Sequence, residues 1–92
     1  MKTKTKYEPI VDAKYLHDYL IDVTFKDRTH RVIDLEKFVK TSKFPLVRKF
    51  APLKLFKQFR VEHSSLAWGD NECDIDPFDV YAGKYDAMLE HA

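Results

Sequence analysis

The strongest constraint on the fold is the alternation of apolar and polar residues between positions 18 and 25. In this stretch, DYLIDVTF, apolar side chains occupy every second position: Tyr19, Ile21, Val23 and Phe25. Because successive side chains of a β-strand point to opposite faces of its sheet, this period of two predicts a half-buried strand. The segments at 8–15 and 29–33 are also rich in β-branched and aromatic residues. The sequence therefore predicts three strands before residue 34.

The second and third predicted strands are separated only by Lys26, Asp27 and Arg28, which predicts a hairpin. A two-residue hairpin loop favours glycine, since its backbone needs positive φ angles, and this loop has none. A longer or bulged loop is therefore expected.

The rest of the chain is predicted to form short elements. Asp34 could accept hydrogen bonds from the exposed amides of a first helical turn and so cap a helix. Pro45 and Pro52 bias the residues before them away from helical backbone and divide the next stretch into pieces. The predicted elements are helices at 35–39, 46–50 and 53–57 and strands at 59–63 and 66–69.

The order of these elements predicts a domain of class α+β: a small antiparallel sheet of three N-terminal and two short later strands, with short helices in the middle and at the C-terminus. A chain of 92 residues fits one domain with a small core. We expect a disordered leader at 1–6, a single domain at 7–85 and a frayed tail at 86–92.

Composition indicates a folded module outside the membrane. Hydrophobic residues make up 45% of the chain, but no apolar run approaches the roughly 18 residues that cross a bilayer. The Lys- and Thr-rich start leads into no apolar signal region. A lone cysteine, Cys73, has no second thiol for a disulfide or a metal pair and is best interpreted as a small buried hydrophobe. We therefore expect a cytoplasmic protein without a cofactor.

The segment WGDNECDIDP, residues 68–77, places carboxylates at every second position: Asp70, Glu72, Asp74 and Asp76. A calcium loop that started at Asp70 would need glycine at its sixth position and glutamate at its twelfth, where the chain has Ile75 and Tyr81. A row of carboxylates on an extended chain could attract a divalent cation, but nothing here specifies a coordination geometry. No catalytic pair can be identified either, so we predict neither a metal site nor an enzyme.

A structural role explains the end of this segment better. Asp76 suits an N-cap, Pro77 the first helical position and Asp79 the first turn, where negative charge complements the helix dipole. The sequence predicts a helix over 77–82 that Gly83 ends. Three apolar residues are expected to hold it against the core: Ile75, Phe78 and Tyr81.

Charge is distributed unevenly although the net charge is only +1. Residues 37–61 contain eight basic residues and no acidic one, whereas residues 62–92 contain one basic and eight acidic residues. The basic block could contact nucleic acid phosphates, and its five phenylalanines could stack on bases, although phenylalanines at such spacing are mostly core. Alternatively, a protein partner or a second copy could recognise the opposed charges. Candidate contacts in segment 37–60 are Lys40, Lys43, Arg48, Lys49, Lys54 and Lys57, and the acidic candidates are Asp70, Glu72 and Asp74.

The strand DYLIDVTF, the VIDL at 32–35 and the tail FRVEHSSLAWGDNECDIDPFDVY at 59–81 resemble a bacterial family, domain of unknown function 2442. The resemblance implies a small α+β domain, similar to the N-terminal domain of a two-domain helix-turn-helix protein. It also implies a gene that often lies beside another small uncharacterised one, as in a toxin–antitoxin pair, and it supplies no site residues. We therefore favour a non-enzymatic protein-binding module, such as the antitoxin-like member of a pair, with nucleic-acid binding through 37–60 as the alternative.

Overall fold

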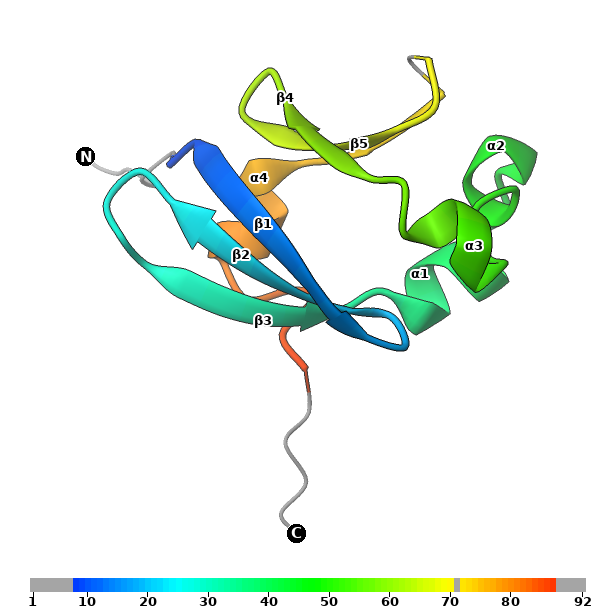
Figure 1. Ribbon diagram of the computed structural model, residues 1–92, viewed down its shortest axis with the longest axis horizontal. Coiled ribbons are helices and arrows are strands. Elements are labelled where there is room, and N and C mark those ends of the chain that lie inside the picture. The colour runs from blue at the N-terminus through cyan, green and yellow to red at the C-terminus, as the bar shows by residue number, and fades with distance from the viewer. Residues whose placement is uncertain (1–7, 71, 88–92) are drawn as a thin grey trace, which may run out of the picture.

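Two antiparallel sheets and several short helices form the structure, a computed structural model that describes residues 8–70 and 72–87 (Figure 1). Sheet A consists of β1 (Ile10–His17), β2 (Leu20–Phe25) and β3 (His30–Asp34). Sheet B consists of β4 (Arg60–Glu62), β5 (Ser65–Trp68) and β6 (Cys73–Ile75). The helices are α1 (Glu36–Thr41), α2 (Pro45–Arg48), α3 (Leu53–Phe56) and α4 (Pro77–Tyr81). The predicted α+β class and antiparallel pairing are confirmed.

Sheet A follows the predicted alternation closely. The strands lie in the order β1-β2-β3, and Ile21 of β2 pairs with Tyr15 on one side and Ile33 on the other. Ile21, Val23 and Phe25 are at most 1% exposed. The apolar face of β2 is thus buried in the core, as the period of two predicts.

The loop between β2 and β3 is bulged, as expected from its lack of glycine. The amide of Arg28 donates to the carbonyl of Phe25 at 2.8 Å, and the amide of Phe25 donates to the carbonyl of Thr29 at 2.9 Å. Arg28 has a φ of 76°, in the left-handed region. This is the pattern of a three-residue loop in which a turn is followed by one left-handed residue.

Helices α1, α2 and α3 lie together at one end of the molecule (Figure 1). Pro45 begins α2 and Pro52 is the N-cap of α3, so the two prolines divide this region as predicted. The helix cap predicted at Asp34 is wrong by one residue: the N-cap of α1 is Leu35, although the Asp34 carboxylate does accept from the amide of Glu36 at 3.0 Å. Among the described residues, no helix is long and apolar enough to cross a membrane.

Sheet B differs in detail from the prediction. The two predicted later strands do not extend sheet A but form a separate sheet, and β6 supplies a third strand that the sequence analysis did not identify. The β4–β5 turn consists of His63 and Ser64, both with positive φ, at 53° and 70°. The carbonyl of Ser64 accepts from the amide of Ile10 at 3.0 Å, so this turn connects sheet B to the start of β1.

Helix α4 begins as predicted. The Asp76 carboxylate accepts from the amide of Phe78 at 2.9 Å, and Pro77 occupies the first turn. Gly83, with a φ of 91°, follows the helix, where its amide donates to the carbonyl of Val80. The prediction that Phe78 holds the helix to the core is wrong: Pro77 and Val80 are its buried residues, because they lie on the face turned toward the sheets.

The core lies between the two sheets and contains buried residues of β1, β2, β3, β5 and β6 and of the helices, while Val61 of β4 packs partly buried against it. Trp68 is fully buried at its centre, and its indole packs beside Phe56 with ring centroids 5.8 Å apart. Tyr19, in the turn between β1 and β2, packs edge-on against Phe56, and its hydroxyl donates to the carbonyl of Ala51. These contacts fasten the short helices to both sheets.

The chain continues past α4 along the outer edge of β3. Asp86 forms a bridge with Ile33, and the amide of Ala87 donates to the carbonyl of Val32 at 2.9 Å. Residues 86 and 87, assigned to a frayed tail by the sequence analysis, therefore pair with sheet A. The predicted leader at 1–6 and the remainder of the predicted tail, 88–92, lie outside the described residues.

Candidate functional site

All six basic candidates lie on α1, α2 and α3 or within two residues of them. We call residues 36–57 the helical end (Figure 1). It carries seven basic residues and one acidic residue, Glu36. The six candidates are all exposed: Lys40, Lys43, Arg48, Lys49, Lys54 and Lys57. The structure therefore brings the sequence-predicted cations to one end of the molecule.

Two of these cations are already paired within the chain. The Nζ of Lys40 lies 2.9 Å from the Oε2 of Glu36, and this hydrogen bond raises the pKa of Lys40. The Nζ of Lys49 lies 2.9 Å from both carboxylate oxygens of Glu72. The second pair joins the basic block to the acidic segment. Part of the charge that looks unbalanced in the sequence is thus neutralised by the fold.

Two other cations, Lys43 and Arg48, form no ion pair with the described residues. The Nζ of Lys43 lies 6.0 Å from the ring centroid of Phe44. The Nη1 of Arg48 donates to the carbonyl of Ser42 at 2.8 Å, which holds its guanidinium beside the same segment. These side chains keep positive charge available at the surface.

The acidic candidates do not form a row of carboxylates. The chain turns at Gly69, where φ is 70°, and β6 begins only at Cys73. Asp70 and Glu72 lie in the turn, and Asp74 is exposed on sheet B. Within 8–70 and 72–87, no group of three His, Cys, Asp or Glu side chains is placed to hold a metal ion.

Cys73 is a buried free thiol that belongs to the core cluster. Burial raises its pKa to about 11, and the neighbouring carboxylate of Asp74 adds to this shift. Since the thiolate is the reactive form of cysteine, this thiol is unreactive near neutral pH.

The five phenylalanines of the basic block have different environments. Phe50 and Phe56 are 4% and 0% exposed, and Phe38 and Phe59 pack partly buried against the core. Phe44 is 61% exposed. The expectation that these aromatics are mostly core is confirmed for four of them, and Phe44 is the one of the five that the burial of the described residues leaves mostly exposed.

Phe44 is part of a small exposed surface that the sequence analysis did not single out. Leu46, two residues further on, is 52% exposed, and α2 buries none of its residues. Lys43 and Arg48 flank these two apolar side chains. We call Lys43, Phe44, Leu46 and Arg48 the Phe44 surface. The one sequence signal for it is a proline that starts a helix too short to bury an apolar face.

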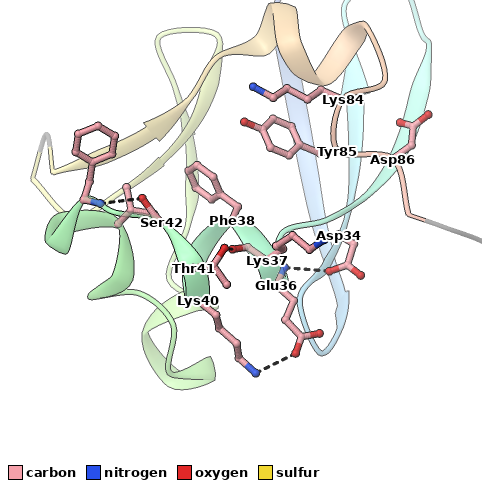
Figure 2. A pocket seen from close by; sticks show the side chains of 12 residues that line it. Asp34, Glu36, Lys37, Phe38, Lys40, Thr41, Ser42, Lys84, Tyr85 and Asp86 are labelled. Atoms are coloured by element: carbon pink, nitrogen blue, oxygen red, sulfur yellow. Dashed lines mark hydrogen bonds and ion pairs between the residues drawn. The ribbon is translucent and has the colours of Figure 1, made fainter.

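The Phe44 surface lies between two hollows, because Phe44 and Val47 line both of them. The first, of about 830 Å³, is bounded by α1 and by residues 84–86. Phe38 and Tyr85 lie on its wall (Figure 2). Their ring centroids are 5.8 Å apart. The second, of about 480 Å³, lies against sheet B, where Ser65 contributes to its lining. An exposed aromatic ring with a hollow on each side is a geometry suited to contact with another molecule.

The fold and its surface define a small α+β domain with two antiparallel sheets and a basic helical end. The family model described as "Protein of unknown function (DUF2442)" matches residues 10–86, and the chain belongs to this family. The resemblance found in the sequence is thereby confirmed. Neither the curated proteins nor the solved structures gave a match.

Proposed function

We propose that this chain is a non-enzymatic protein-binding module that contacts its partner through the helical end. The observation that carries the proposal is the exposure of Phe44 and Leu46 between two hollows. Exposed apolar side chains are common singly, but two on one short segment beside concave surface are typical of interaction sites. Aromatic side chains that enter such an interface contribute much of the binding energy.

Nucleic-acid binding is the weaker candidate because the fold removes much of what it would need. Of the six cations, Lys40 and Lys49 are paired with carboxylates; of the five phenylalanines, Phe50 and Phe56 are buried, and Phe38 and Phe59 pack partly buried against the core. The measurement that tests this alternative is anisotropy of a labelled mixed-sequence duplex and single strand at about 50 and 200 mM salt, where phosphate contacts weaken steeply. Tight, salt-sensitive binding would favour it over a protein partner.

The finer proposal is that the module is the antitoxin-like member of a cytoplasmic pair. The gene arrangement that the family resemblance implies supports it, together with the exposed surface. We expect the chain and the product of its neighbouring gene to elute as one complex after co-expression. We also expect the neighbour to slow growth when it is expressed alone and not when both are expressed.

Variants of the exposed apolar residues test whether the partner binds at the helical end. The double change Phe44→Ser and Leu46→Ser should abolish co-elution, whereas Val11→Ser, at a residue that is 53% exposed on β1, should not. Two separately eluting species with the unmodified chain would count against the proposal.

A further inference from the structure

We infer that the Phe44 surface takes an acidic segment of a protein partner, with an aromatic or aliphatic side chain of that segment packed beside the Phe44 ring. This inference rests on the proposed function and adds the chemistry of the occupant. It follows from the charge around Phe44, from the mostly apolar first hollow beside it and from the rigidity of the backbone there.

The charge around Phe44 selects a negative occupant. Lys43 and Arg48 flank the ring, and neither is paired with a carboxylate among the described residues. The sequence has no acidic residue between positions 37 and 61. Three carboxylates line the second hollow: Glu72 is held by Lys49, Glu62 is paired with Arg60, and Asp74 is exposed on sheet B. A basic or neutral segment would leave Lys43 and Arg48 uncompensated in the interface, whereas carboxylates would pair with them.

The first hollow favours an apolar side chain within that segment. Phe38, Val47 and Tyr85 line the first hollow beside Phe44. The three carboxylates that line it are already engaged: Asp34 accepts from the amide of Glu36, Glu36 pairs with Lys40, and Asp86 pairs with Arg31 at 2.7 Å. The hollow therefore offers its ring and aliphatic atoms to an apolar side chain, and the acidic groups of the occupant belong at the Lys43 and Arg48 side.

The backbone at Phe44 is fixed before binding. Its amide donates to the hydroxyl of Ser42 at 3.1 Å, and its carbonyl accepts from the amides of Val47 and Arg48 at 3.0 and 3.2 Å. Pro45, which follows, locks its own φ. Little conformational freedom of this segment remains to be lost on association, which favours binding.

The test is selection of random 12-residue peptides displayed on phage against the unmodified chain. We expect the selected pool to be enriched in Asp and Glu around an aromatic or aliphatic residue. Synthetic peptides from the pool should bind the Lys43→Glu/Arg48→Glu variant and the Phe44→Ser variant at least tenfold more weakly. The matched controls Lys26→Glu, in the exposed β2–β3 loop, and Val11→Ser should bind as the unmodified chain does. Circular dichroism melting checks that each variant is folded.

The other outcomes overturn the inference in distinguishable ways. A pool without acidic excess whose peptides still bind the Phe44→Ser variant more weakly would leave the proposed function standing and overturn the inference. Peptides that bind the Phe44→Ser variant as well as the unmodified chain would count against both. A failure to select any peptide would count against both. A concentration-dependent dimer in sedimentation that Phe44→Ser abolishes would identify the occupant as a second copy of this chain.

Discussion

The indole Nε1 of Trp68 donates a 2.8 Å hydrogen bond to the backbone carbonyl of Phe56 inside the core. The bond joins β5 to the last residue of α3 across twelve positions of the sequence. Trp68→Phe keeps an aromatic ring but leaves this buried carbonyl without its donor and removes part of the packed volume. We expect a loss of about 2–4 kcal/mol of unfolding free energy, measured by urea denaturation followed by circular dichroism. Phe44→Ala should change it by less than about 0.5 kcal/mol, since that ring is exposed; equal losses in the two variants would contradict this account.

The capping carboxylate of Asp76 supports a second prediction. Asp76→Ala removes the acceptor for the amide of Phe78 and should cost about 0.5–2 kcal/mol of stability. Asp76→Ser, which restores a capping oxygen, should recover most of this loss, and Asp70→Ala should have little effect. An unfolding midpoint that rises with added calcium or magnesium would contradict the capping role and indicate a metal site.

The β4–β5 turn should be open to stabilisation. His63 and Ser64 both adopt left-handed backbone, which costs non-glycine residues about 1–2 kcal/mol each. Because Asn-Gly is the preferred pair for a two-residue turn of this kind, His63→Asn with Ser64→Gly should raise the thermal unfolding midpoint and add about 1–2 kcal/mol. A lower midpoint for the double variant would show that the His63 or Ser64 side chain contributes more than its backbone strain costs.

A similar argument applies to Arg28, whose φ is 76°. Arg28→Gly should stabilise the domain by about 0.5–1 kcal/mol, the relief of strain being partly offset by the greater freedom of glycine in the unfolded chain. The neighbouring change Asp27→Gly should instead destabilise it, because the Asp27 carboxylate accepts from the amide of Thr29 and from the hydroxyl of Tyr81. Chemical denaturation of both variants tests the pair, and a gain in stability from Asp27→Gly would be inconsistent with this loop geometry.

The raised pKa of Cys73 predicts a loss of stability at alkaline pH. The pKa of this thiol is about 11 in the folded protein against an ordinary value of 9.0, so the folded state holds the proton more tightly. Its contribution is fully present below pH 9 and is lost as pH rises through about 11. Urea unfolding at pH 8 and pH 10.5 should show a steeper decline for the unmodified chain than for Cys73→Val. Parallel declines would contradict this role of the thiol.

The sequence predicted correctly those elements whose structure is determined by residues close to one another in the chain. The alternation through β2 needs only the two faces of one strand, and the start of α4 needs only Asp76, Pro77 and the amide two residues beyond the cap. Strand β6 was missed because it has three residues and exists through its pairing with β5. The residues of β6 directly precede the N-cap of α4. The sequence pattern there was interpreted as the start of that helix, and no strand was predicted.

The candidate surface could be predicted only in part, because exposure is a property of the packed molecule. The position of the basic block was readable from charge alone. Phe44 and Phe50 both lie in that block beside a lysine, yet their exposed fractions are 61% and 4%. Phe44 is the N-cap of the single-turn helix α2, which buries none of its residues, whereas Phe50 follows the helix and packs into the core. The Lys49–Glu72 pair was likewise unpredictable, since it joins residues 23 positions apart.

The short stretch Tyr85–Ala87 has a consequence for any shortened form of the chain. Its backbone accepts from Asp34 and donates to Val32, which occupies hydrogen-bonding groups on the outer edge of β3. Removing it would expose the Asp34 amide and the Val32 carbonyl on the edge of a sheet whose exposed Val32 side chain adds an apolar contact. Such an edge is a template for pairing with a strand of another chain. These three residues occupy the position on β3 at which such a strand would add to sheet A.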